Sequence, residues 1–123
     1  MTIALFGGTG FIGRYVLEKL LKEGFNVNML VREGSELRYP DESKNIKYII
    51  GDVRDDQAQF RTLTGADCVI YLIGLIREFP SKGITFQSLH YEVPVSIMKL
   101  STEIGIQRFI YMSANGVKPK GTS

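Results

Sequence analysis

The sequence predicts an α/β fold in which about five parallel strands, in the order 3-2-1-4-5, form one sheet with helices on both faces. The first observation behind this prediction is the alternation of short apolar runs with longer helical segments, which is typical of right-handed strand–helix–strand crossovers. The second is a glycine-rich loop between the first apolar run and the first helical segment. The third is a glycine after each helical segment, where left-handed backbone ends a helix.

The N-terminal half predicts a strand, a helix and two further strands. Residues 3–6 form a short apolar run that ends on glycine, as a buried parallel strand does. Residues 11–23 show helical periodicity, and Gly24 ends that helix. Strands are expected at 26–31 and 45–50, with a polar stretch between them. The side chains expected on the inward face of the helix are Ile12, Tyr15, Val16, Lys19 (its aliphatic stem only) and Leu20.

A short helix and a fully covered strand follow. Residues 57–63 predict the helix, which ends at Gly65. Residues 67–73 predict the fourth strand, whose nearly continuous apolar content indicates that both of its faces are covered. The single cysteine, Cys68, lies within this run, so we expect it to be buried and unreactive.

A long helix and a fifth strand complete the predicted elements. Residues 86–104 form the helical stretch, and Gly105 ends it. Pro94 lies inside this stretch, so it either kinks the helix or belongs to the first turn of its second part. Residues 108–112 predict the fifth strand, and we expect the chain to stop before a sixth.

The strongest motif is the loop Gly7-Gly8-Thr9-Gly10-Phe11-Ile12-Gly13, which follows a strand and opens a helix. Glycine allows the turn after the strand, and the absence of a Cβ lets phosphate oxygens approach the backbone. The N–H groups and the dipole of the following helix favour an anion, and Gly13 lets that helix approach the first strand. A phosphate loop of the Walker A type is excluded, because Arg14-Tyr15 stand where lysine and a hydroxyl residue are required. The sequence therefore predicts a Rossmann-type pyrophosphate site that comprises Gly7, Thr9, Gly10, Phe11, Ile12 and Gly13.

The end of the second predicted strand bears on the choice of cofactor. An NAD site places Asp or Glu there to bind the ribose 2′-hydroxyl, whereas this chain has Arg32. A guanidinium suits a 2′-phosphate, which it can bind through two hydrogen bonds. We therefore predict NADP as the cofactor. NAD remains the alternative, because Glu33 follows immediately and would serve the ribose if the chain turns differently.

Five motifs occur in order along the whole chain: GGTGFIG at 7–13, Leu30-Val31-Arg32, Gly51-Asp52-Val53-Arg54-Asp55, Tyr71-Leu72-Ile73-Gly74, and the stretch from Arg108 to Ala114. On these residues the chain resembles the extended and atypical short-chain dehydrogenase/reductase families. It looks most similar to NmrA-like members and to relatives of an accessory subunit of respiratory complex I. The likeness extends to NAD-dependent epimerases and dehydratases.

The resemblance implies roles for several residues beyond the glycine loop. Asp52 and Val53 would border the adenine, with the Asp52 carboxylate meeting the exocyclic amine. Leu72, Ile73 and Gly74 would pass beneath the adenosine ribose and the pyrophosphate. The residues themselves leave another role open for Asp52, because it precedes a short helix and also suits a turn or a cap.

Three departures from the family pattern bear on catalysis. His90 stands where these families carry an asparagine, and it is either a packing residue or a participant in proton relay or cofactor binding. Ser113 is followed by Ala114, so the second hydroxyl, the catalytic one in the family, is missing; Ser113 is expected near the cofactor. The family's Tyr-x-x-x-Lys pair would follow Ser123, and the match at residues 15–19 is expected to be coincidental. We therefore predict no catalytic residue in this chain.

Taken together, residues 1–123 predict the N-terminal portion of an NAD(P)-binding domain, with the substrate domain elsewhere. The parent would be an oxidoreductase or a nucleotide-sugar epimerase/dehydratase-like protein. The alternative is a non-catalytic NADPH-binding module for redox sensing or assembly. The apolar edge of the fifth strand predicts a homodimer, and the lone cysteine suits the cytoplasm.

Composition excludes other classes of partner. A formal net charge of +2 does not favour nucleic acid or an anionic membrane. The apolar run at residues 1–6 is far shorter than a membrane span. One histidine, one cysteine and scattered carboxylates predict no metal site.

Overall fold

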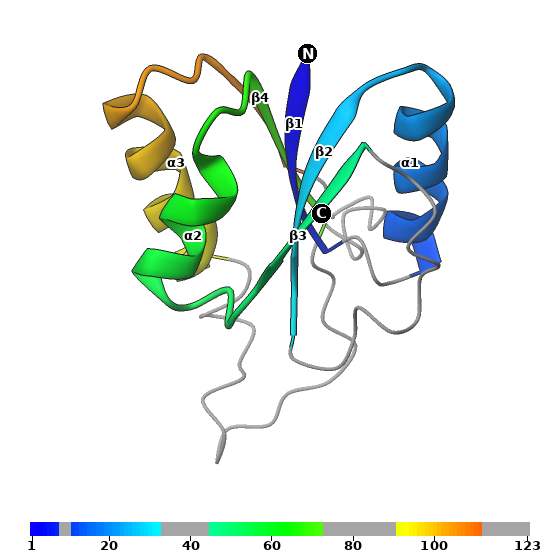
Figure 1. The fold of residues 1–123 in the computed structure, drawn as a ribbon. Coiled ribbons are helices and arrows are strands. Elements are labelled where there is room, and N and C mark those ends of the chain that lie inside the picture. Colours follow the sequence, from blue (N-terminus) through cyan, green and yellow to red (C-terminus); the bar gives the residue numbers. More distant parts are fainter. Residues whose placement is uncertain (8–10, 33–44, 73–90, 112–123) are drawn as a thin grey trace, which may run out of the picture.

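The computed structural model describes residues 1–7, 11–32, 45–72 and 91–111 of the chain. These residues form a five-stranded sheet between two helical layers (Figure 1). In chain order the elements are β1 (Thr2–Phe6), α1 (Phe11–Lys22), β2 (Asn26–Val31), β3 (Ile46–Ile50), α2 (Asp56–Leu63), β4 (Cys68–Tyr71), α3 (Val93–Glu103) and β5 (Arg108–Tyr111).

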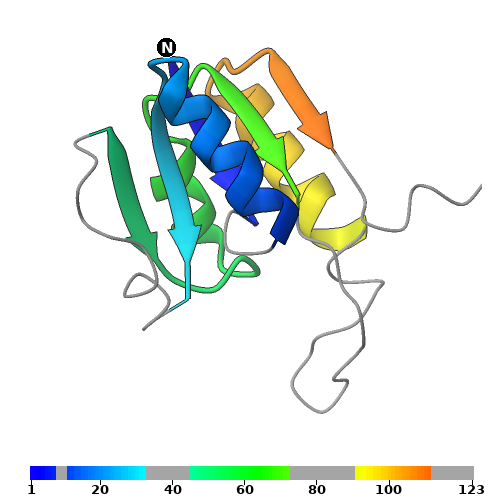
Figure 2. The same ribbon diagram turned by 90° about the vertical axis from the view of Figure 1, so that its right-hand side faces the viewer.

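The sheet has the order β3-β2-β1-β4-β5, and every neighbouring pair is parallel. This confirms the predicted fold class and strand order. Helix α1 covers one face, and α2 and α3 cover the other (Figure 1). Viewed onto the α1 face, β3 and β5 lie at opposite edges of the sheet (Figure 2). β4 is buried along its whole length, as its apolar run predicted.

Each strand contributes alternate side chains to two separate cores. On β1, Leu5 packs into the core under α1, whereas Phe6 packs into the core under α2 and α3. On β4, Cys68 belongs to the α1 side, and burial raises the pKa of its thiol. Cys68 is thus a buried packing residue, as the sequence predicted, since a raised pKa disfavours the reactive thiolate.

The inward face of α1 differs from the predicted one. Ile12 and Tyr15 are 50% and 70% exposed, whereas Leu17 is only 2% exposed. The buried line runs through Gly13 and Leu17, because a glycine at the first of these positions lets the helix axis approach the sheet. This rotation turns Ile12 and Tyr15 outward. Val16 and Leu20 remain partly buried against the core, as predicted.

Helix α3 settles the role of Pro94. The helix begins at Val93 with proline in its first turn, where the missing N–H is not required by the helix. Gly105 follows the helix with a φ of +93°, as expected for a glycine that ends it. Residues 86–90 of the predicted stretch lie outside the described residues.

Candidate cofactor site

The carboxyl ends of the strands and the N-termini of α1, α2 and α3 lie on the same side of the sheet, across the strand ends (Figure 1). This side is called the carboxyl edge below. Phe6, the last residue of β1, is level with Leu30 on β2 and with Tyr71 on β4. The backbone N–H of Leu72 donates to the Phe6 carbonyl at 2.8 Å, so the chain after β4 stays beside the end of β1. In open parallel sheets a ligand binds at this edge, where successive crossovers diverge to opposite faces.

The start of the glycine loop has the backbone that a phosphate site requires. Gly7 follows β1 directly and has a φ of +98°, which side chains other than glycine rarely adopt. Helix α1 begins at Phe11, so its N-terminus lies at this edge and offers positive potential to an anion. Gly13 is buried against the sheet. Thr9, Gly10 and the side chain of Phe11 lie outside the described residues.

Arg32 and Asp52 lie together at the far side of this edge. Arg32 is exposed directly after β2, and the Gly51 N–H donates to the Val31 carbonyl at 2.9 Å, which keeps the ends of β2 and β3 level. The positive charge of Arg32 contributes to a lowered pKa of Asp52. The structure thus places Arg32, predicted to bind the 2′-phosphate, and Asp52, predicted to contact the adenine, just after the level ends of two neighbouring strands.

The Asp52 carboxylate is held by its own turn. Oδ1 accepts from the Arg54 backbone N–H at 2.8 Å and from Arg54 Nε at 2.9 Å, and Oδ2 accepts from Nη2 at 2.6 Å. The Arg54 side-chain hydrogen bonds are the main reason that the pKa of Asp52 falls to about 2. Asp55 caps α2, because its carboxylate accepts from the Gln57 N–H. Asp52 therefore has the turn role that the sequence left open, and the carboxylate is ionised at neutral pH.

The sequence analysis missed two buried amide side chains on the α2 side of the sheet. Gln59 on α2 donates from Nε2 to the Val53 carbonyl at 2.8 Å and accepts from the Ser96 hydroxyl at 3.0 Å. Asn28 on β2 donates from Nδ2 to the carbonyls of Thr62 and Thr64, both at 3.1 Å. The available signal was a polar residue at a position where periodicity expects an apolar one.

A close packing contact sets the distance between the β3–α2 turn and the helix. A Cβ placed on Gly51 would lie 2.8 Å from the Cβ of Ala58, which is closer than two carbons pack. Gly51 therefore lets α2 lie against the end of β3. The motif glycine at this position is needed for helix packing, which in turn places Asp52 and Val53.

A row of aromatic rings crosses the sheet just before the strands end. Phe6, Tyr71 and Tyr111 occupy the same level on β1, β4 and β5. The Phe6 and Tyr71 ring centroids are 6.3 Å apart, and Tyr71 meets Tyr111 edge-on at 5.5 Å. Burial raises the pKa of the Tyr71 hydroxyl. Leu72 follows this row and is buried on the α1 side.

The remaining predicted site residues lie outside the described residues; these are Ile73, Gly74 and Ser113, as well as Glu33 and His90. Across the described ranges, no group of three or more histidine, cysteine or acidic side chains is arranged to hold a metal ion. Nor does any helix in those ranges have the length and apolar character to cross a membrane.

A family model described as NAD(P)H-binding matches residues 7–123, from the glycine loop onward. The chain belongs to this NAD(P)H-binding family. The match confirms the predicted dinucleotide cofactor at the level of NAD(P), and positive-φ Gly7 ahead of α1 agrees with it. We therefore describe the chain as an NAD(P)-binding domain of the kind found in oxidoreductases and epimerase-like proteins.

Curated relatives of this NAD(P)-binding domain agree with the predicted resemblance. The mitochondrial NADH dehydrogenase (ubiquinone) 1 alpha subcomplex subunit 9 of Mus musculus is 30% identical over 97% of this chain and 32% of its own length. The N-acetyl-alpha-D-glucosaminyl-diphospho-ditrans,octacis-undecaprenol 4-epimerase of Escherichia coli O157:H7 is 30% identical over 94% of this chain and 33% of its own. The chain thus spans about a third of these relatives.

Solved structures agree on the fold. A short-chain dehydrogenase/reductase superfamily protein from Agrobacterium tumefaciens, solved with bound NAD, superposes with a TM-score of 0.75 at 21% identity. The superposition covers 98% of this chain and 34% of that one. Because the sheet and its crossovers are shared, the edge described above corresponds to the usual ligand edge of such sheets.

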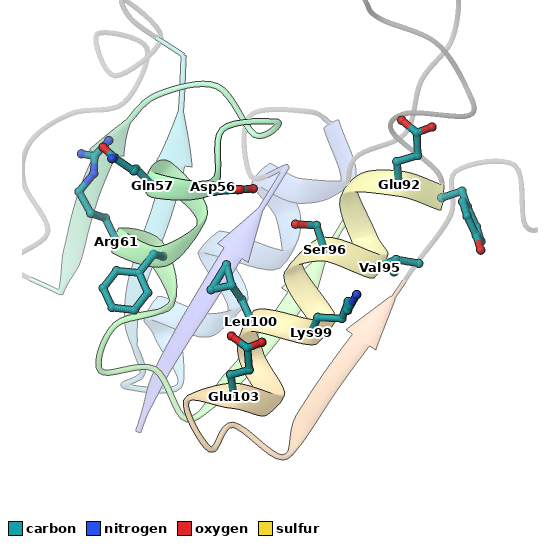
Figure 3. A pocket seen from close by; sticks show the side chains of 11 residues that line it. Asp56, Gln57, Arg61, Glu92, Val95, Ser96, Lys99, Leu100 and Glu103 are labelled. Carbon is teal, nitrogen blue, oxygen red and sulfur yellow. The ribbon is translucent and has the colours of Figure 1, made fainter.

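A separate groove of about 920 Å³ lies between α2 and α3, on the outer face of the helical layer (Figure 3). Its walls combine exposed apolar residues such as Phe60 and Tyr91 with charged ones such as Arg61 and Glu92. Helix α1, which follows the glycine loop, covers the opposite face of the sheet. None of the described residues predicted to contact the cofactor lines this groove.

Proposed function

We propose that this domain binds NADPH in preference to NADH and presents it to a reaction that the rest of the protein completes. When bound, the nicotinamide supplies hydride chemistry, whereas the domain supplies binding and orientation. The observation that carries the preference is the exposed Arg32 at the end of β2, beside an Asp52 that is already ionised and engaged by Arg54. An exposed guanidinium at that place favours a 2′-phosphate over a 2′-hydroxyl.

In this proposal residues 1–123 are the N-terminal portion of one NAD(P)-binding domain, and the substrate domain lies elsewhere in the protein. The glycine loop binds the pyrophosphate, Arg32 binds the 2′-phosphate, and the β3–α2 turn borders the adenine. The segment after β4 lies beneath the ribose. The proposed cofactor contacts are Gly7, Thr9, Gly10, Phe11, Ile12, Gly13, Arg32, Asp52, Val53, Leu72, Ile73, Gly74 and Ser113, and none of them is assigned a catalytic role.

Calorimetric titration of the purified chain with NADPH, and separately with NADH, tests the proposal. Tighter binding of NADPH supports it. Equal binding assigns the ribose contact to Glu33 and removes the preference. A folded chain that binds neither dinucleotide contradicts cofactor binding by these residues alone.

Replacing the arginine makes the test specific. Arg32→Ala should weaken NADPH binding about tenfold or more, because a charge-assisted hydrogen bond contributes roughly 1.5–3 kcal/mol, and it should leave NADH binding unchanged. Lys47→Ala is the matched control, because Lys47 is an exposed cation on β3. Equal losses in the two variants would mean that Arg32 acts only through general charge.

A non-catalytic NADPH-binding module for redox sensing or assembly is the second candidate. Ala114 replaces the hydroxyl residue that is catalytic in the family, and the mouse relative is named as a subunit of NADH dehydrogenase. The two candidates differ in turnover. Oxidation of NADPH by the complete protein with a carbonyl or sugar-nucleotide substrate supports the enzyme, and binding without turnover supports the module.

The exposed edge of the sheet suggests self-association in the cytoplasm. In the part of the chain that the structure describes, β5 pairs with β4 on one side, and Ile110 and Tyr111 are 43% and 40% exposed. An apolar edge strand tends to pair with another chain, so we propose a homodimer that buries β5. Light scattering at increasing concentration should show a dimer, and a monodisperse monomer would exclude it.

A further inference from the structure

Gln59 is a fully buried polar side chain at the base of the β3–α2 turn. It is 1% exposed and spans the space between the turn and α3. Its Nε2 donates to the Val53 carbonyl at 2.8 Å, and its Oε1 accepts from the Ser96 hydroxyl at 3.0 Å. Ser96 extends from α3 toward α2 (Figure 3). A leucine or methionine would suit this position in an ordinary core, so the amide requires an explanation.

The two partners fix which way the amide faces. A carbonyl oxygen can only accept, so the Val53 oxygen requires the NH2 group of Gln59 on its side. The amide oxygen is then left for the Ser96 hydroxyl, which can donate. Because the site is buried, an inverted amide would place two acceptors together without water to separate them. The Val53 carbonyl therefore sets the orientation of the amide, and the hydrogen bond from Ser96 holds the Gln59 side chain in place.

The peptide unit between Val53 and Arg54 is held at both ends. Gln59 binds its carbonyl oxygen, and the Asp52 carboxylate accepts from its N–H at 2.8 Å. A peptide unit is planar and rigid, so fixing its carbonyl also fixes the direction in which its N–H points. The direction of that N–H in turn sets where the Asp52 carboxylate lies.

We propose that Gln59 is a positioning residue for the adenine end of the cofactor site: through this single peptide it aims Asp52, and Ser96 keeps it in place. The proposal rests on the adenine role assigned to Asp52 and Val53 under the proposed function. It links α3, on the helical layer, to the recognition of the adenine base at the edge of the sheet.

The test compares two buried amides that tie α2 to its surroundings: Gln59, on the helix itself, and Asn28, on β2. Gln59→Met removes the amide at the N-terminal half of the helix, whereas Asn28→Leu removes the amide that binds the Thr62 and Thr64 carbonyls at its C-terminal end. Both variants leave buried or partly buried polar groups without their hydrogen bonds, so similar losses of stability are expected from each. Their effect on base recognition should differ.

The probes are NADPH and its hypoxanthine analogue, in which the exocyclic amine of the adenine is replaced by a carbonyl oxygen. The unmodified chain should prefer NADPH by about tenfold, as expected for one charge-assisted hydrogen bond. Gln59→Met should reduce this preference to about twofold or less, whereas Asn28→Leu should retain it. Ser96→Ala should give a preference between those of the unmodified chain and Gln59→Met. Because it removes only one hydroxyl group, it replaces Gln59→Met in the test if that variant does not fold.

The outcomes separate this inference from the proposed function. Retained base preference in Gln59→Met, or in Ser96→Ala where that variant is used in its place, overturns the role of Gln59 and leaves cofactor binding intact. An unmodified chain that binds NADPH without preferring adenine overturns the Asp52 contact and this inference with it. An unmodified chain that binds neither probe overturns the proposed function itself.

Discussion

The two faces of the sheet are stabilised in different ways. The core under α1 consists of apolar side chains such as Leu5, Leu17 and Met29. Among the described residues, the buried asparagine, glutamine, serine and threonine side chains are all on the other side, within α2 and α3 or bonded to α2. Apolar burial is not directional, so it stabilises the packing of α1 on the sheet without fixing the direction of any group. Hydrogen bonds are directional, so they also fix the positions of α2 and of the β3–α2 turn.

The largest expected effect is on the apolar face. Leu5→Ala should lower the free energy of unfolding by about 3–4 kcal/mol, because Leu5 is fully buried and its truncation leaves a cavity. Urea denaturation measures the loss. The preference of the folded variant for NADPH over its hypoxanthine analogue should be unchanged, since the side chain contacts the α1 core and not the β3–α2 turn. A weaker preference would show that the α1 core also sets the geometry of the adenine end of the site.

The second effect is on the hydrogen-bonded face. Asn28→Leu should cost about 2–3 kcal/mol, because it leaves the buried Thr62 carbonyl and the partly buried Thr64 carbonyl, at the C-terminal end of α2, without their donor. Asn28→Asp is the informative companion, since its carboxylate would face the same two carbonyls and should cost more. A leucine variant as stable as the parent would mean that the amide adds nothing beyond its volume.

The strand order, the buried central strand and the helix-ending glycines could be predicted from the sequence. Each depends on a local pattern, such as the unbroken apolar run of β4 or the glycine after α3, and local patterns are visible in one chain. The two roles predicted for Pro94, a kink or a place in the first turn of a helix, also included the observed one, the first turn of α3. The resemblance to a family correctly indicated NAD(P) as the kind of cofactor.

The rotation of α1 and the two amides could not be predicted. Apolar residue types alone chose Ile12 and Tyr15 as inward positions, but close packing at Gly13 turned the helix so that Leu17 is buried instead. Asn28 binds carbonyls more than thirty residues away in the chain. Such pairs depend on how the helix docks on the sheet, which no local pattern records.

The third effect is on the packing of α2 against the end of β3, where Gly51 lies next to Ala58. Gly51→Ala should cost about 1–2 kcal/mol, because the new Cβ would lie 2.8 Å from Ala58 and α2 must move away. The same substitution should cost less in an Ala58→Gly background, where the opposing methyl group is gone. Chemical denaturation of the four chains measures this coupling, and strictly additive losses would exclude the contact as the cause.

The smallest effect is at the surface of the turn. Arg54→Gln should lower stability at pH 7 by no more than about 1 kcal/mol, because the Asp52 side chain is 48% exposed and solvent screens the ion pair.

The pH dependence of this loss tests its cause. The pKa of Asp52 is about 2 in the folded chain against 3.8 as the reference value, so the contribution of the ion pair to stability is present above pH 4 and is lost as the pH falls toward 2. The difference between the two chains should therefore shrink over that range. Arg61→Gln, which removes the same charge from an arginine that donates to the Ile50 carbonyl, should show a stability difference that does not shrink in this way. A pH-independent difference for Arg54→Gln would mean that the arginine stabilises the turn by packing, and that the ionised Asp52 is held by the Arg54 backbone N–H rather than by its side chain.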